Sequence, residues 1–230
     1  MGRSKTLTSR KALTAATLVT TVGLTLAACT VEHPRGDKTT PPAANGSAGT
    51  PSMTFDEAYR KVPMNGTANQ PITWDVTSTP DTEEVLAARR SFAFLHWEKQ
   101  ATDWAPILPI GRYLYTDDYY ASVFAPFITS TSPIEDPWAG PIWVKSVGVE
   151  QMAPDRQRVT FCADLGNWHH GSEKPYAAPG HRGVIQSYEM QNVESGDGER
   201  HWLTDRVFNP DIDRQAKYGS ACTKWAVHKP

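Results

Sequence analysis

The chain has 230 residues, of which 39% are hydrophobic and 21% are charged, and its formal net charge is −2. This length suits one domain with a tail, and the slightly acidic balance argues against a nucleic-acid partner, which requires a basic face.

The first 28 residues have the parts of a bacterial lipoprotein signal peptide. Four basic residues between Arg3 and Lys11 precede an uncharged run from Ala12 to Ala28, which ends in Leu26-Ala27-Ala28-Cys29. This tetrapeptide resembles a lipobox, so we expect export by the general pathway, removal of residues 1–28 and acylation of Cys29. An ordinary secretory signal is the alternative, and it leads to export as well.

Acylation of Cys29 predicts attachment to the outer face of the cytoplasmic membrane by lipid alone. The run from Ala12 to Ala28 is too short to span a bilayer stably, and no other segment lacks charge for a spanning length. Two or more acyl chains, palmitate among them, hold a protein firmly. Without its leader the chain has 19 basic and 25 acidic residues, a formal charge of −6.

Two further cysteines, Cys162 and Cys222, remain once Cys29 is acylated. Outside the cytoplasm such a pair most simply forms a disulfide. A redox or metal-binding thiol pair is the weaker alternative, because the sequence has no Cys-x-x-Cys spacing.

Composition divides the mature chain into a tether and a domain. Residues 30–52 are dense in Pro, Gly, Thr, Ser and Ala and contain no aromatic side chain, so we expect a flexible coil of roughly 25–30 Å. The aromatic residues all lie between Phe55 and Trp225. We therefore predict a lipidated N-terminus and tether at 29–52 and a single domain at 53–230.

Three helices are predicted in the first half of this domain. A capping box at Thr54–Glu57 predicts a short helix to Val62, and residues 64–80 are expected to be extended, with Trp74 as an anchor. The cap and proline near Pro80 predict a long amphipathic helix to about Ala101. A third helix is expected at 116–125, ended by Pro126, with an inward face of Tyr119, Tyr120, Val123 and Phe124.

From Ile142 onward the pattern alternates and predicts two hairpins. The first spans 142–165 with a turn at 153–155, and the second spans 184–208 around the turn residues 195–198. Four antiparallel strands after several helices predict an α+β fold, in which a curved four-stranded sheet wraps around the N-terminal helices like a cone.

Residues 79–225 resemble a group of secreted bacterial lipoproteins with the nuclear transport factor two-like fold. The resemblance rests on the helix-rich first half, the stretch Val159–Asp164, Trp168, the long hairpin and Cys222. It implies a cone-shaped α+β domain, a fold that hosts dehydratases, isomerases and binding modules alike. The chain departs from it in the insert 126–141 and the loop 167–181.

Asp164 is the first candidate for catalysis. Inside a closed cone its carboxylate would have a raised pKa and would act as a general base, with His169 as an acid/base partner. The alternative is a structural role at the strand end, where Asp164 caps the Gly166-Asn167 turn or pairs with Arg158 or Arg206.

Histidines supply the next candidates. His169-His170 and His181 offer imidazole ligands, but adjacent strand residues point to opposite sides, and a polar surface loop is the simpler interpretation. His96, near Glu98 and Asp103, either faces the cone or is a partly buried, hydrogen-bonded structural histidine.

Two further patterns are weaker. Asp211-Ile212-Asp213 lacks the glycine and closing glutamate of a calcium loop. An aromatic platform for wall sugars competes with ordinary core packing for four tryptophans: Trp138, Trp143, Trp168 and Trp202. Nucleophile-elbow, phosphate-loop, HExxH and dinucleotide-binding motifs are absent from the sequence.

The sequence therefore predicts a lipid-anchored extracytoplasmic domain without cofactor or metal. We expect a non-enzymatic module whose cone pocket or exposed sheet binds a small apolar ligand, a wall component or an envelope protein. The rival hypothesis is a dehydratase-like or isomerase-like enzyme that uses Asp164 and a histidine.

Overall fold

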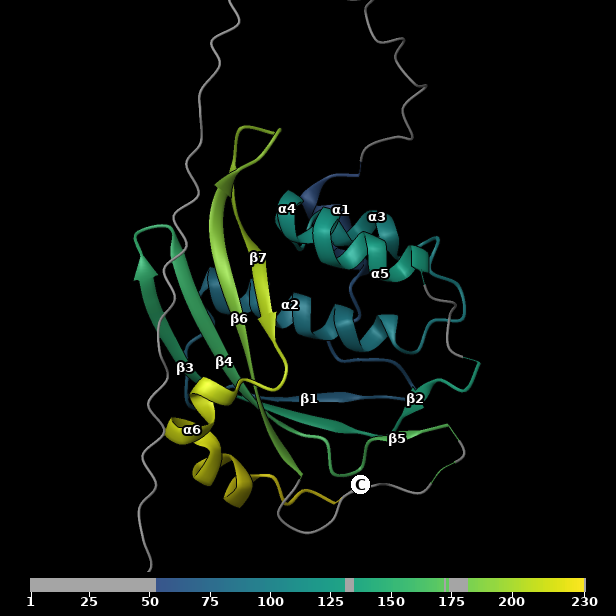
Figure 1. Cartoon of the computed structure of the whole chain (residues 1–230), viewed down its shortest axis with the longest axis vertical. Coiled ribbons are helices and arrows are strands. Elements are labelled where there is room, and N and C mark those ends of the chain that lie inside the picture. Colours follow the sequence, from purple (N-terminus) through teal and green to yellow (C-terminus); the bar gives the residue numbers. More distant parts are fainter. Residues whose placement is uncertain (1–52, 131–134, 172, 174–181, 230) are drawn as a thin grey trace, which may run out of the picture. The chain divides into compact units, whose positions relative to one another are not determined.

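The computed structural model describes residues 53–130, 135–171, 173 and 182–229. The predicted signal peptide, Cys29, the predicted tether and His181 lie outside these residues. The described elements, in chain order, are α1 (Phe55–Lys61), β1 (Ile72–Asp75), α2 (Glu83–Glu98), α3 (Leu108–Gly111), α4 (Asp117–Tyr119), the π-helical turn η1 (Tyr120–Phe124), α5 (Ala125–Ser130), β2 (Trp138–Ala139), β3 (Ile142–Ala153), β4 (Arg156–Asp164), β5 (His169–His170), β6 (Gly183–Glu194), β7 (Arg200–Phe208) and α6 (Ile212–Trp225) (Figure 1).

The main sheet has five strands in the order β1-β3-β4-β6-β7 and curls strongly around α2 (Figure 1). Both predicted hairpins, β3–β4 and β6–β7, are confirmed, and so is the α+β class. The expectation of four antiparallel strands was wrong, because β1 adds a parallel edge strand in which Ile72 pairs with Ile142. A strand of four residues is too short to show a clear alternation, and its partner lies far along the chain.

Helix α2 fills the concave side of the sheet, where it packs against β4, β6 and β7. Phe92 is fully buried and makes edge-on contacts with Trp74 and Phe161. The helix begins after Thr82 and ends at Glu98, so it is shorter at both ends than the predicted helix. Burial of this aromatic face is the main source of stability for the domain.

The segment after Thr116 differs from the predicted helix. Thr116 is its N-cap and not its first residue, and the helix continues past Pro126 as α5. The Ala125 N–H bonds to the Tyr120 carbonyl, and this wider π turn directly precedes the proline, which lacks an N–H of its own. Val123 is 48% exposed and does not face inward, whereas Tyr120 and Phe124 are buried.

A C-terminal helix, α6, covers the opposite face of the sheet over β4 and β6. This helix was not predicted from the sequence, and Asp211 is its N-cap, accepting a hydrogen bond from the Arg214 N–H. Few large apolar residues mark its inner face. A Cβ at Gly148 would collide with the Tyr218 hydroxyl, so the glycine permits the close approach of α6.

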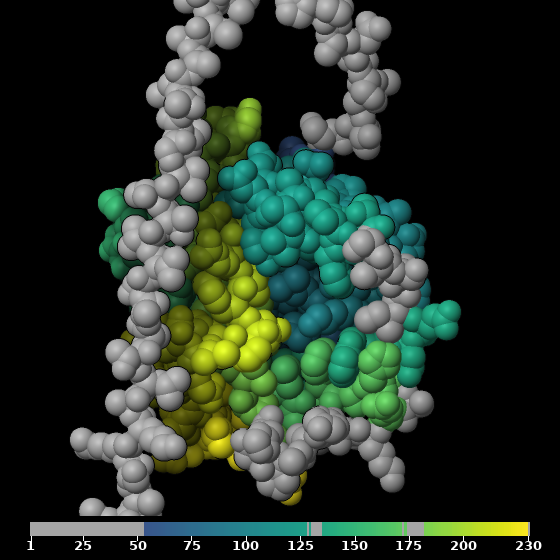
Figure 2. Space-filling model, viewed as in Figure 1, coloured from purple at the N-terminus to yellow at the C-terminus, as the bar shows by residue number. Residues whose placement is uncertain are grey.

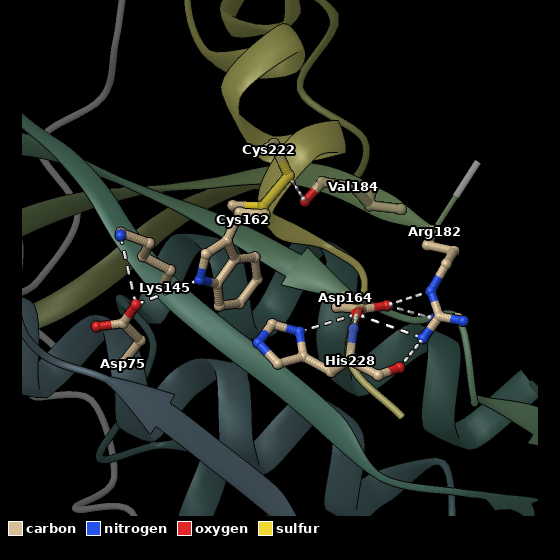
Figure 3. The surroundings of a disulfide bond; sticks show 10 residues. Asp75, Lys145, Cys162, Asp164, Arg182, Val184, Cys222 and His228 are labelled. Atoms are coloured by element: carbon tan, nitrogen blue, oxygen red, sulfur yellow. Dashed lines mark hydrogen bonds and ion pairs between the residues drawn. A yellow bond between two sulfur atoms is a disulfide. The ribbon is translucent and has the colours of Figure 1, made fainter. Parts of the chain in front are cut away.

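Cys162 of β4 and Cys222 of α6 form a disulfide between sheet and helix (Figure 3). Their Cα atoms lie 5.5 Å apart, and together with Ile185 the two cysteines form a second, smaller core. Within the described residues, none of the helices has both the length and the apolar composition needed to cross a membrane.

Removal of the disulfide should lower the free energy of unfolding. The bond closes a loop with a sequence separation of 60 residues, so the double variant Cys162→Ala, Cys222→Ala should lose about 4 kcal/mol in urea unfolding, because its unfolded chain regains entropy. Wild-type protein unfolded with and without reductant is the control. A loss under about 1 kcal/mol would contradict a stabilising crosslink.

Candidate functional site

Asp164 lies on the outer face of the sheet, not inside the cone. Residues alternate along β4, so Val159, Phe161 and Ala163 belong to the core around α2, while Cys162 faces α6. Asp164 shares the phase of Cys162, and Figure 3 shows it beside the disulfide with Arg182 and His228. The position within the cone that the catalytic hypothesis requires is therefore not observed.

The carboxylate of Asp164 is fully buried, and both of its oxygens accept hydrogen bonds. The Gly166 N–H donates at 2.9 Å, Arg182 Nε lies at 3.2 Å, and the N–H and Nδ1 of His228 lie at 2.9 and 3.0 Å (Figure 3). Burial is the largest influence and raises the pKa of Asp164, but these hydrogen bonds together outweigh it and hold the pKa below its ordinary value. The raised pKa that the catalytic hypothesis requires is therefore not found.

These contacts make Asp164 a clamp that holds the chain after α6 against the sheet. The expected capping of the turn at Gly166 is observed, but the arginine partner is Arg182. Arg158 and Arg206 both face Glu189 instead. No lone pair of Asp164 is left in a geometry that favours proton transfer.

His169 and His170 are not in a surface loop but form the short strand β5, which pairs with β2. His169 Nδ1 lies 3.0 Å from the Gly171 carbonyl, and His170 Nδ1 lies 3.5 Å from Asp136. The structure therefore does not bring His169 to Asp164, whose histidine partner is His228.

His96 is buried beneath Trp168, 3% exposed, and its ring contacts Phe92. Burial lowers the pKa of His96 to about 3, with a smaller contribution from Lys99. The imidazole is therefore neutral at ordinary pH. Among the described residues its Nδ1 has no hydrogen-bond partner, so the residue is structural but not hydrogen-bonded through this atom.

The four tryptophans do not form one platform. Trp138 and Trp168 stack on each other with ring centroids 3.9 Å apart, and this contact occupies one face of each ring. Trp143 stacks instead on His228 at 5.0 Å, and Trp202 lies on β7. Packing within the domain accounts for most of these rings.

The C-terminal end of α2 forms the floor of a mainly apolar cleft of about 300 Å³, which we call the Glu98 cleft. In Figure 2 the blue surface of α2 appears in a recess between the teal helices and the yellow segment after β7. Its lining residues are Leu95, Glu98, Lys99, Tyr119, Val123, Phe124, Phe127, Val207 and Asn209.

Helical spacing explains why Glu98 faces this cleft. Leu95, Glu98 and Lys99 are three and four positions apart, so they share one face of α2, while His96 points elsewhere. The chain then turns back over the helix end, where Trp104 Nε1 donates to the Glu98 carbonyl at 3.2 Å. This turn helps to bury the side chain of Glu98 at the end of α2.

Glu98 is the unusual group of the cleft. It is 5% exposed, and among the described residues its carboxyl has neither a hydrogen bond nor an ion pair. Burial raises the pKa of Glu98, while nearby Lys99 lowers it to a smaller degree. A carboxylate without partners is costly in apolar surroundings, and this cost is the cause of the upward shift of the pKa.

Lys99 does not compensate Glu98. Its Nζ lies 5.3 Å from the centre of the Trp168 ring, in a cation–π contact at the edge of the cleft. Burial lowers the pKa of Lys99, and Glu98 opposes this effect. The ammonium is thus held by an indole and not by the neighbouring carboxyl.

A second unpaired polar group lies behind the cleft wall. Tyr115 is fully buried against Tyr119 and Phe124, and its hydroxyl has no partner among the described residues. Burial raises the pKa of Tyr115, with further contributions from Tyr188, Tyr119 and Glu98. The interior near Glu98 therefore contains one buried hydroxyl that has no hydrogen-bond partner among the described residues.

Two other clefts are more polar. The larger, about 580 Å³, lies between the β6–β7 hairpin and α4, and one of its cations, Arg156, already pairs with Asp205 at 3.1 Å. The other, about 280 Å³, contains Arg90 over the Tyr59 ring. Neither combines an apolar wall with an unpartnered buried group.

One cluster within the described residues has spacing compatible with a metal ion, at Asp197, Glu199 and His201 on the β6–β7 turn. Both acidic residues are exposed. His201 already pairs with Asp197 through Nε2, and its ring stacks on Phe55. The predicted histidines of β5 are not part of it.

No protein-family model, no curated protein and no solved structure matches this chain. The assignment of the site therefore rests on its geometry.

The unpaired carboxyl predicts a pH-dependent stability. The pKa of Glu98 is higher in the folded chain than its ordinary 4.5, so its burial is harmless at low pH and destabilises the protein as the pH rises through the folded value. Glu98→Gln should match wild type near pH ~4 in urea unfolding and become progressively more stable than wild type toward pH ~8. The exposed Glu83→Gln on the same helix is the control, and a difference independent of pH would refute the prediction.

Proposed function

We propose that this chain is an exported, lipid-anchored protein whose domain is a non-enzymatic module that binds a small apolar ligand in the Glu98 cleft. The observation that supports this most is the combination of a mainly apolar wall with one unpaired carboxyl nearly excluded from solvent. Ligand pockets commonly have this composition, in which few polar groups orient a mostly apolar guest.

The dimensions of the cleft indicate the size of the ligand. At about 30 Å³ for each water-sized group, about 300 Å³ holds roughly ten non-hydrogen atoms. Tyr119, Phe124 and Val207 offer apolar surface from three different elements of the fold, α4, η1 and β7. A compact ligand of this size suits the cleft better than an extended glycan.

A binding role is supported further by the state of the predicted catalytic residues. Asp164 is saturated with hydrogen bonds, and His169 contacts a backbone carbonyl. Neither group faces the Glu98 cleft, so the acid/base pair of the rival hypothesis has no support from the geometry.

The proposal includes a location at the outer face of the membrane and a nuclear transport factor two-like fold. The lipobox-like Leu26–Cys29 and the tether 30–52 would hold the domain near the outer face of the membrane, where apolar molecules partition. The strongly curled sheet around α2 supports membership in the nuclear transport factor two-like group.

The lipid anchor is tested at Cys29. Replacement by Ala should abolish acylation, so the protein should move from the membrane fraction to the soluble or unprocessed fraction, with the mass expected for a chain without lipid. Cys162→Ser is the control and should remain membrane-bound. Unchanged fractionation and unchanged mass of Cys29→Ala would refute the anchor.

The cleft is tested by filling it. In the Cys29→Ala full chain, small apolar probes such as acetophenone and α-methylstyrene should give saturable amide shifts around Lys99 and Tyr119 in NMR spectra. Val123→Trp should abolish these shifts because the indole occupies the cleft. Val76→Trp is the matched control, since both valines are 48% exposed. Absence of saturable binding, or binding that survives Val123→Trp, would refute the proposed function.

A further inference from the structure

We propose that the groove of about 280 Å³ between α1, α2 and the first residues of β7, which we call the Arg90 groove, is a second binding site, and that it takes a small zwitterion with the charge arrangement of an α-amino acid. This site is separate from the Glu98 cleft, with which it shares no lining residue.

Arg90 supplies the cationic side of the groove. Its guanidinium carbon lies 4.0 Å from the centre of the Tyr59 ring, and this cation–π contact holds the partly buried side chain in place. Among the described residues, the Arg90 guanidinium has neither an ion pair nor a hydrogen-bond acceptor. An arginine positioned in this way can bind a carboxylate through two parallel hydrogen bonds.

Carboxylates supply the opposite charge. Asp56 of α1, Glu83 of α2 and Glu199 before β7 line the same groove, and all three are exposed and have no ion pair among the described residues. Burial lowers the pKa of Arg90, and the charge of Asp56 opposes this effect. Asp56 is therefore close enough to act on the guanidinium, although the two side chains do not pair.

Charge complementarity favours a ligand that carries both signs. A pure anion would meet three carboxylates, and a pure cation would meet Arg90 and also Arg200, whose guanidinium already donates to Asn192. An uncharged ligand would displace water from these charges without compensating them. A molecule with adjacent carboxylate and ammonium groups avoids these costs, because Arg90 binds the first group and the acidic side chains bind the second.

The remaining surface and the volume limit the rest of the ligand. Leu86, Ala87 and Trp202 contribute apolar surface to the groove, and the Trp202 indole has no ring partner among the described residues. At about 30 Å³ for each water-sized group, the groove holds roughly nine non-hydrogen atoms. An α-amino acid with an aliphatic side chain, such as leucine, matches both the size and the apolar surface.

Four compounds with one carbon skeleton and the same number of non-hydrogen atoms test the charge requirement: leucine, leucinamide, 2-hydroxy-4-methylpentanoate and 2-hydroxy-4-methylpentanamide. At pH ~6.5, below the pKa of an α-amino group, they are a zwitterion, a cation, an anion and a neutral molecule. Each is titrated by NMR into the Cys29→Ala full chain. Leucine should bind most tightly, by roughly twofold to fivefold over each singly charged compound, which is the contribution of one partly exposed ion pair.

Variants assign the two charges. Arg90→Gln should remove the advantage of leucine over leucinamide, and Asp56→Asn should reduce its advantage over the hydroxy acid. Asp213→Asn is the matched control, because Asp213 is also the exposed second residue of a helix, α6, and it should behave as wild type. Val123→Trp, which fills the Glu98 cleft, should leave leucine binding unchanged.

The outcomes separate this site from the proposed function. Equal binding of the four compounds, or tightest binding of any compound other than leucine, would overturn the inference. Absence of saturable leucine binding would also overturn it and leave the function of the Glu98 cleft intact. Leucine shifts that Val123→Trp abolishes would refute the Arg90 groove as the site. The comparison of the four compounds on the unsubstituted groove decides the question even if Arg90→Gln does not fold.

Discussion

The structure depends on the burial of α2 in the concave side of the curled sheet. Phe92 meets aromatic rings from β1 and β4, and this contact sets how closely the sheet wraps around the helix. The sheet contacts α2 through β4, β6 and β7, while the end of α2 lies under the segment from α4 to α5. The Glu98 cleft exists because this segment covers the helix end incompletely.

The outer face of the sheet is secured by different forces. There α6 has little apolar surface, and a covalent bond and a buried ion pair compensate for this. The disulfide joins the helix to β4, and Asp164 ties the segment beyond the helix to the sheet through His228 and Arg182. Polar residues that resemble a catalytic set thus serve to hold a weakly apolar element in place.

Local signals predicted much of the fold. The capping box at Thr54, the alternation of β3 and β4 and the turn residues 195–198 each specify structure through short-range chemistry, and the structure contains the corresponding elements. By contrast, β1 is defined by a distant parallel partner, and α6 is defined by its crosslink to β4. The four residues of β1 are too few to leave a periodic pattern, whereas α6 has one that was overlooked, since Tyr218, Cys222 and Trp225 recur at helical spacing.

The candidate site was predicted less well, because the face of a side chain matters more than its type. Asp164 and Glu98 are both acidic, but strand phase directs one toward α6 and helix phase directs the other into an apolar cleft. Glu98 was noted only as a neighbour of His96. Counting helix positions from Leu95 would have placed Glu98 on the face of Leu95 and His96 on a different face.

Lys99 lines the Glu98 cleft and also contacts the indole of Trp168. Its ammonium lies over Trp168, which in turn stacks on Trp138, so any guest that displaces this cation changes the electrostatic field across a tryptophan pair. Indole emission responds strongly to such fields. If the cleft binds a ligand as proposed, the fluorescence of this tryptophan pair should report its occupancy without an added label.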